Sequence, residues 1–244
     1  MLPSYLEKSL ELSLIQKVAV FALPVLFAIT LHEAAHGYVA KYFGDLTAYA
    51  AGRVSLNPLR HIDLMGTIIV PLLTLAVTTA SGSGILFGWA KPVPVNFANL
   101  RNPKRDMLWV AAAGPLSNLF MALIWALALN AGVGLGTSHA ASAWLMFVGA
   151  AGIFVNVIFV VLNLFPLPPL DGGRIMVSLL PQRLAWRFAR IERFGFIILL
   201  LLLFSGVLWL FLSPLIAATL SGIATVFGIP EAGLYQLLRF LRLV

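Results

Sequence analysis

Three long stretches of the chain contain no Asp, Glu, Lys or Arg, and apolar side chains fill them almost continuously. They run from 64 to 90, from 107 to 170 and from 194 to 230. A fourth apolar stretch, 18–31, continues in a helical pattern to residue 43. Because about 20 apolar residues span a bilayer as a helix, this pattern predicts an all-α polytopic membrane protein. The stretches are continuous rather than short and alternating, which argues against a β-barrel.

Breaks within these stretches indicate where the helices begin and end. We expect a first long helix at about 12–43 and two further spans near 107–130 and 143–165. After residue 194 the sequence allows one long span with an interfacial helix, or two short spans. The total is therefore about four to six transmembrane helices. The last residues, LYQLLRFLRLV, predict a basic amphipathic helix on the membrane surface.

The polar connections predict short insertions between the spans. Residues 46–62 are expected to form a loop with a short strand around Gly52–Leu56, and residues 85–106 form a loop rich in Pro, Asn and basic groups. Either the strand region or the 85–97 loop could pair with an extended substrate by β-augmentation. A plain surface loop is the alternative for both.

Composition agrees with a membrane protein. Hydrophobic residues make up 61% of the chain and charged residues 10%, against about 25% charged in a soluble domain, and the mean hydropathy is +0.98. The net charge of +7 is typical of Lys and Arg gathered in cytoplasmic loops, so we expect no nucleic-acid partner. The absence of cysteine excludes disulfides and thiolate metal sites.

The sequence His32-Glu33-Ala34-Ala35-His36 is the strongest chemical signal. Residues i and i+4 lie on one face of a helix, so both imidazoles can reach one Zn²⁺. Glu33 is placed beside them to polarise a metal-bound water. The alternative is a helix end that emerges into water here, since Lys41 and Asp45 follow closely.

A zinc site of this kind needs a third protein ligand and an open fourth position. The side chains that could supply the ligand are Asp45, His61, Asp63, His139 and Asp171. Asp171 differs from the rest because it ends the long charge-free stretch, after three prolines and before two glycines. Prolines end helices, and broken backbone at membrane depth is tolerated only in a protein interior or a cavity. The alternative for Asp171 is a helix cap or turn at the membrane surface.

Several motifs together resemble the site-2 protease family of intramembrane zinc metalloproteases. They are HEAAH at 32–36, GPLSN at 114–118 and the segment from Asn163 to Gly172, with FGWAKPVPVN at 87–96 and NPLRHID at 57–63 similar to the compact prokaryotic branch without a PDZ domain. The resemblance covers roughly residues 20–180. It implies one Zn²⁺ per chain bound by His32, His36 and Asp171, with Glu33 as the general base.

The same resemblance suggests that two asparagines, Asn118 and Asn163, line the site. There they would orient the substrate backbone or stabilise the tetrahedral oxyanion. Hydrogen bonding between helices, a common use of Asn in membranes, is the alternative for each.

Joint ligation would require the histidines and Asp171 to lie at one membrane depth, which demands an odd number of full crossings between them. The 107–130 span is one, so we expect 64–80 to be re-entrant. The whole of 41–106 then lies on one side with seven basic residues, followed by none in 131–142 and five in the next loop. This positive-inside pattern puts the active site toward the cytoplasm.

We therefore expect a single transmembrane metalloprotease domain over 1–244, with a catalytic core at about 12–180 and C-terminal helices at 194–244. Its function would be that of a zinc-dependent intramembrane endopeptidase in a prokaryotic cell (inner) membrane, with transmembrane proteins as substrates. A non-catalytic metal-dependent scaffold is disfavoured because Glu33 is intact. A transporter is disfavoured by the charge-free stretch. The sequence leaves the oligomeric state open.

Overall fold

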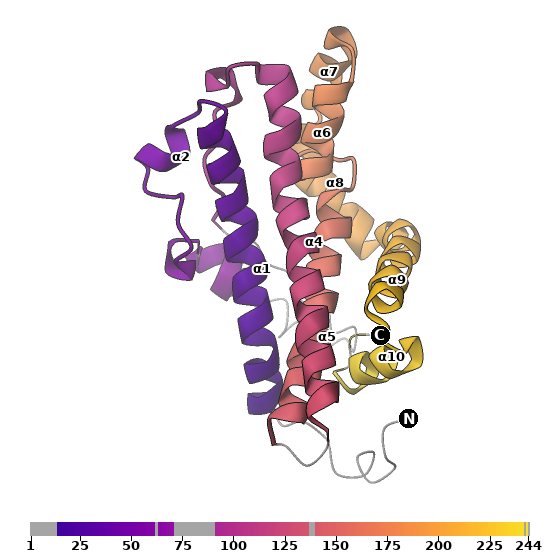
Figure 1. The fold of residues 1–244 in the computed structure, drawn as a ribbon. Helices are drawn as coiled ribbons and strands as arrows, with labels where there is room; N and C mark the ends of the chain where they lie inside the picture. Colours follow the sequence, from indigo (N-terminus) through magenta and orange to yellow (C-terminus); the bar gives the residue numbers. More distant parts are fainter. Residues whose placement is uncertain (1–13, 62, 71–90, 137–139, 242, 244) are drawn as a thin grey trace. The chain divides into compact units, whose positions relative to one another are not determined.

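The computed structural model describes residues 14–61, 63–70, 91–136, 140–241 and 243. Within these residues the regular structure is helical and includes no strand (Figure 1). Four helices are long and apolar enough to cross a membrane: Val18–Tyr42, Pro103–Leu135, Ala141–Asn163 and Val207–Phe227. The predicted class, an all-α polytopic membrane protein, is confirmed.

The chain divides into two compact units. The first comprises Met1–Ala28 and Pro115–Val244, and the second comprises Ile29–Gly114. The boundaries fall inside two continuous helices, α1 (Leu14–Tyr42) and α4 (Pro103–Leu135). The single functional domain expected from the sequence stays a prediction.

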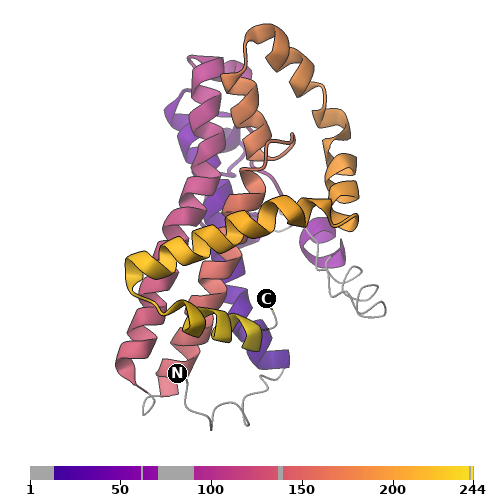
Figure 2. The ribbon, with the colours of Figure 1, turned by 90° about the vertical axis from the view of Figure 1, so that its right-hand side faces the viewer.

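The first unit is built around α5. Its helices after α4 are α5 (Ala140–Asn163), α6 (Asp171–Leu179), α7 (Gln182–Ala189), α8 (Glu192–Phe204), α9 (Val207–Phe227) and α10 (Glu231–Phe240). Ile153 and Val157 of α5 are fully buried, and α9 and α10 pack against this helix. Figure 2 shows α9 crossing α5 obliquely. The helices expected near 107–130 and 143–165 are present as α4 and α5, and α4 extends further at both ends.

In the C-terminal region α9 is a candidate membrane span, whereas α8 is too short to be one. Two helices replace one long span, because Gly206 adopts a left-handed conformation (φ +75°) between α8 and α9. The 13 residues of α8 extend only about 20 Å, which is less than the hydrocarbon core of a bilayer. The last helix, α10, is amphipathic as predicted, but Leu234, Leu237 and Leu238 are buried in the protein core. Its apolar face therefore packs on the protein rather than on lipid.

The second unit holds the loops around the C-terminal half of α1. Its short elements are α2 (Thr47–Ala50), η1 (Pro58–Arg60), the π-type turn η2 (Leu64–Ile69) and η3 (Phe97–Asn99). The strand expected around Gly52–Leu56 does not form. Arg53 N donates to Ala48 O instead, and Ser55 O lies 2.8 Å from His61 Nε2, so the backbone there bonds to local groups and not to a strand partner. Most of the expected re-entrant stretch, 71–80, lies outside the described residues, and the re-entrant path stays a prediction.

Candidate active site

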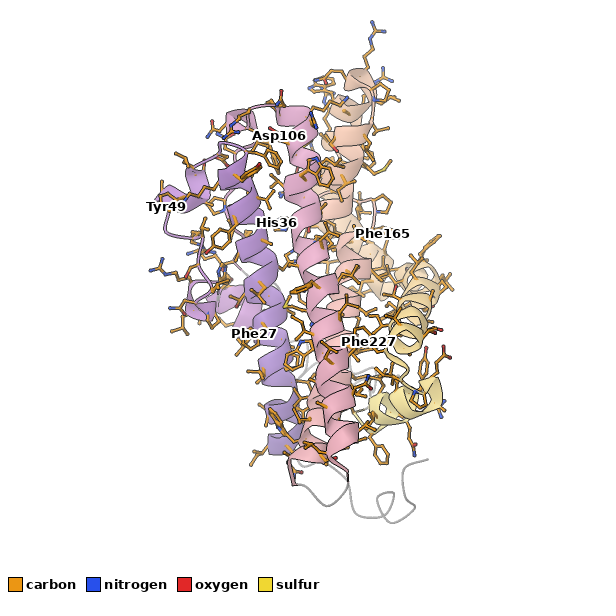
Figure 3. All side chains as sticks on the ribbon, in the orientation of Figure 1. Phe27, His36, Tyr49, Asp106, Phe165 and Phe227 are labelled. Atoms are coloured by element: carbon orange, nitrogen blue, oxygen red, sulfur yellow. The ribbon has the colours of Figure 1, made fainter. Side chains whose placement is uncertain are left out.

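The two motif histidines lie on one face of α1 and are buried, with His32 6% and His36 9% exposed. Their Nε2 atoms are 3.1 Å apart, and the rings meet edge to face. Figure 3 labels His36 on this helix. The i and i+4 spacing thus brings two nitrogen ligand atoms together, as the motif predicts.

The hydrogen bond of His36 and the position of its Nε2 atom are those expected of a zinc ligand. Its Nδ1 lies 2.7 Å from the carbonyl oxygen of Val110. A carbonyl can only accept, so Nδ1 carries the hydrogen and Nε2 keeps its lone pair. Zinc-bound histidines are usually oriented by such a second hydrogen bond. Two nitrogens on one tetrahedral zinc would be about 3.3 Å apart, close to the observed 3.1 Å, so the pair fits this metal.

Gly114 of α4 makes room for the two imidazoles. A Cβ at this position would lie 2.5 Å from His32 Cε1 and 2.5 Å from His36 Nε2. Any larger residue would therefore push into the rings. The sequence did not predict this role of Gly114, because its contact with the histidines depends on how α4 meets α1 and neither segment shows it alone.

Glu33 is half-buried and is held by a distant segment of chain. Its Oε2 accepts a hydrogen bond of 2.7 Å from the backbone N–H of Val93, in the irregular stretch 91–96. One turn further along α1, a Cβ at Gly37 would meet side-chain atoms of Val54 and Val93. Val54 and Val93, one from each loop considered for substrate pairing, thus lie against α1 close to Glu33.

The other candidate ligands of this unit hold loops together. Asp45 is fully buried and accepts hydrogen bonds from Thr47, Asn96 and Asn99. Burial alone would raise the pKa of Asp45, but these hydrogen bonds together bring it below its ordinary value of 3.8. The Asp45 carboxylate is therefore engaged in hydrogen bonds that hold these loop residues together.

Two more candidates are also committed to backbone groups. His61 Nε2 lies 2.8 Å from Ser55 O. Asp63 Oδ1 accepts from Gly66 N at 2.7 Å and caps η2. His139 lies outside the described residues.

Asp171 belongs to the first unit, where it is the first residue of α6 and 6% exposed. The loop before it packs closely on three glycines. A Cβ at Gly172 would overlap the carbonyl of Leu164, and a Cβ at Gly173 or Gly195 would overlap backbone atoms of Pro168. The glycines therefore fix the turn that positions Asp171. Gly195, in α8, was not predicted, because a glycine at the start of an apolar run carries no signal of its own.

The two predicted asparagines also lie in the first unit, and they differ in their hydrogen-bond partners. Asn118 is fully buried, and its amide nitrogen donates to Ala28 O at 3.2 Å and to Asn156 Oδ1 at 2.9 Å. Asn163 donates to Phe159 O of its own helix. The bonds of Asn118 are of the kind expected for helix–helix contacts. Asn156 was not predicted as a site residue, although a polar amide in an apolar span is a visible signal in the sequence.

Comparisons with known proteins agree with the motifs. A family model described as Peptidase family M50 matches residues 133–206. The chain is 39% identical over 191 residues to "Putative zinc metalloprotease YwhC" of Bacillus subtilis, a match that covers 76% of this chain and 82% of that protein. Proteins named "Putative zinc metalloprotease Rip2" from Mycolicibacterium smegmatis and Mycobacterium tuberculosis are each 30% identical, with 72% and 68% of their length covered. No solved structure matches the chain.

Apolar helices long enough to cross a membrane and a buried histidine pair beside a carboxylate define a membrane-embedded metalloprotease. The chain belongs to peptidase family M50, the site-2 protease family. The resemblance in the motifs is thereby confirmed, with zinc as the metal of this class. The family match covers the loop and helix that carry Asp171.

Proposed function

We propose that this protein is a zinc-dependent intramembrane endopeptidase that hydrolyses peptide bonds within or near transmembrane segments of other proteins. The observation that carries the proposal is the pair of Nε2 atoms 3.1 Å apart, inside the candidate span Val18–Tyr42 and beside Glu33. Ionisable groups at membrane depth are costly unless they are paired or ligated, which favours a functional role for all three.

In this proposal His32, His36 and Asp171 hold one Zn²⁺, and a fourth position stays open for water. Three features favour Asp171 as third ligand: its burial, its rigid glycine-packed turn and its place in the family motif. Asp45, His61 and Asp63 are each engaged with loop groups. Bound zinc would polarise the scissile carbonyl and bring the pKa of its water toward 7.

Glu33 acts as the proton carrier. Its carboxylate takes a proton from the attacking water and passes it to the leaving amine. The Val93 N–H holds Oε2 and thereby sets the direction of the other oxygen. Asn163 is assigned to the substrate backbone or the oxyanion. Both amide hydrogens of Asn118, the other asparagine of the motif, already donate to Ala28 O and Asn156 Oδ1, so it is assigned to holding its helix in place rather than to the oxyanion.

The substrate is a transmembrane segment that unwinds locally, because an intact helix hides its carbonyls in its own hydrogen bonds. The stretch 91–96 beside Glu33 is the segment best placed to pair with the unwound strand. The site opens toward the cytoplasmic face of a prokaryotic cell membrane, in line with the positive-inside charge pattern.

Glu33→Gln tests the mechanism. The variant keeps the shape and hydrogen-bonding capacity of the side chain but cannot carry the proton, so we expect wild-type zinc content and cleavage reduced by roughly a thousandfold or more. Zinc content and cleavage of a reconstituted membrane substrate are measured on the same samples. Equal cleavage by both proteins would remove Glu33 from the mechanism.

The third ligand is tested by zinc retention in matched carboxylate variants. Asp171→Asn is expected to lose zinc, whereas Asp45→Asn and Asp63→Asn should retain it, because their carboxylates serve loops. Thermal stability of each variant separates a lost ligand from a lost fold. Full zinc retention by Asp171→Asn would assign the third ligand elsewhere.

A further inference from the structure

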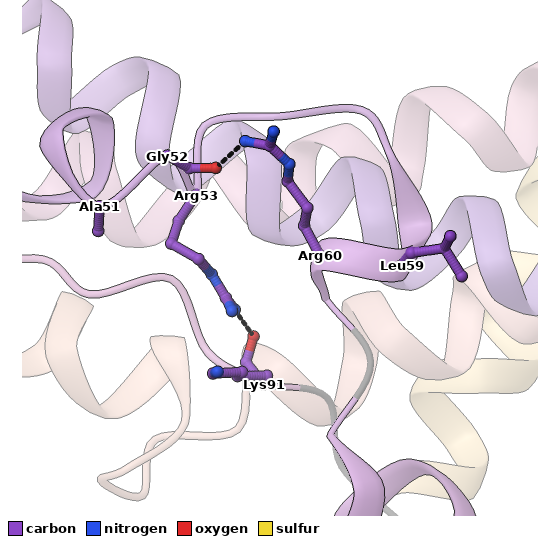
Figure 4. Close-up of a pocket in the computed structure, with 6 residues that line it drawn as sticks. All are labelled: Ala51, Gly52, Arg53, Leu59, Arg60 and Lys91. Carbon is purple, nitrogen blue, oxygen red and sulfur yellow. Dashed lines mark hydrogen bonds between the residues drawn. The ribbon is translucent and has the colours of Figure 1, made fainter.

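A pocket of about 310 Å³ in the second unit gathers three cationic side chains away from the histidines. Its lining residues are Ala51, Gly52, Arg53, Leu59, Arg60 and Lys91 (Figure 4). Among the described residues, no carboxylate makes an ion pair with Arg53, Arg60 or Lys91. The pocket therefore concentrates positive charge that no carboxylate of the described residues neutralises through an ion pair.

Both arginines are held in place by backbone carbonyls. Arg53 Nη2 donates to Lys91 O at 2.7 Å, and Arg60 Nη1 donates to Gly52 O. The Nε of Arg53 is buried and has no hydrogen-bond partner among the described residues. Since a guanidinium offers five N–H donors in a fixed fork, each arginine is oriented by the protein and keeps donors for a further acceptor.

The loop that carries these cations packs near the C-terminal end of a candidate membrane span. Val54, next to Arg53 in sequence, and Val93 both lie against Gly37 of α1. Gly37 precedes Tyr42, the last residue of the candidate span, by about 7 Å along the helix axis. The end of a membrane span meets the headgroup layer, and this proximity is one ground for expecting lipid headgroups beside the cationic loop.

The rim of the pocket and the following turn expose apolar side chains. Leu56, Leu59, Leu64 and Met65 are between 58% and 74% exposed. Cationic groups beside exposed leucines are typical of a segment at the membrane interface, where apolar side chains meet acyl chains and cations meet phosphates.

We propose that Arg53, Arg60 and Lys91 form a binding site for the phosphate of an anionic phospholipid headgroup. The two oriented guanidinium groups supply forked donors that match phosphate oxygens, and Lys91 adds a mobile positive charge. Leu59 packs along the acyl chains of the same lipid. The site is separate from the proposed zinc chemistry and does not depend on it.

The test measures lipid binding to the full-length protein in a neutral detergent by native mass spectrometry, with phosphatidylglycerol and phosphatidylcholine as probes. The double variant Arg53→Gln/Arg60→Gln should weaken phosphatidylglycerol binding roughly tenfold or more. Lys91→Gln should weaken it about fivefold; the hydrogen bonds described for Lys91 involve only its backbone, so the loop is expected to keep its fold.

Arg101→Gln/Arg105→Gln removes the same charge from exposed positions outside the pocket and should change binding less than twofold. An equal loss in this control, or equal binding of the two lipids by the wild type, would overturn the proposal. Inorganic phosphate is added as a competitor. Displacement of the lipid at equal concentration would assign the site to free phosphate instead.

Discussion

Gly114 shows how much of the site depends on a single missing side chain. It lies against both imidazoles, and the space that it leaves is filled by the edges of His32 and His36. The motif HEAAH predicted the histidine pair, because i and i+4 neighbours are fixed by helix geometry. The roles of Gly114 and Asn156 could not be predicted in the same way, because each depends on a contact between helices far apart in the chain.

Gly114→Ala should therefore disturb the histidine pair. The added methyl group would force His32 or His36 out of its rotamer, and we expect zinc affinity to fall roughly tenfold or more, as measured by competition with a chelator. Gly134→Ala is the matched control on the same helix, since a Cβ there meets nothing within 4 Å. Unchanged zinc affinity in Gly114→Ala would contradict the tight fit described for this position.

The stretch 91–96 shows that a segment can be predicted as a loop while its long-range contacts cannot be predicted. The spans were predicted from hydrophobic length, and the break before Asp171 from its prolines, because both signals are local. The stretch 91–96 was placed correctly in a loop, but its hydrogen bond to Glu33 joins residues 33 and 93 and has no local signal. The strand expected around Gly52–Leu56 was wrong because the hydrogen bonds available there are turn-like.

A comparison of Val93→Pro with Val93→Ala tests the contact with Glu33. Both variants lose the branched methyl groups of valine, but only proline removes the N–H that donates to the carboxylate. Since a hydrogen bond to a charged group contributes about 1.5–3 kcal/mol, we expect Val93→Pro to cleave substrate roughly tenfold more slowly than Val93→Ala, with equal zinc content. Equal rates would mean that this hydrogen bond does not orient Glu33.

At the scale of the whole molecule, charge and helix length together predict a membrane topology. The 33 residues of α4 extend about 50 Å, which exceeds the thickness of a bilayer with its headgroups, so its two ends are expected on opposite sides. Basic residues flank its N-terminal end, and none occurs in 131–142. The charge distribution could be read from the sequence alone, whereas the full length of α4 comes from the structure; the topology stays a prediction.

The natural absence of cysteine makes this topology easy to test. Single variants Ser55→Cys and Asn99→Cys should react with a membrane-impermeant maleimide from one side, and Leu135→Cys from the other. Labelling is compared between right-side-out and inverted vesicles. Opposite sidedness of Ser55→Cys and Asn99→Cys would rule out a re-entrant path between them.

The buried carboxylate of Asp45 links two loops by hydrogen bonds, as a disulfide links segments covalently in many small secreted proteins. Through Thr47, Asn96 and Asn99 it staples two loops that are some fifty residues apart in the chain. Because its folded pKa is below the ordinary 3.8, this staple is at full strength above that pH and is released as the pH falls through the lower folded value. Reducing agents will therefore leave the link between the two loops intact, whereas strong acid will break it by protonating Asp45.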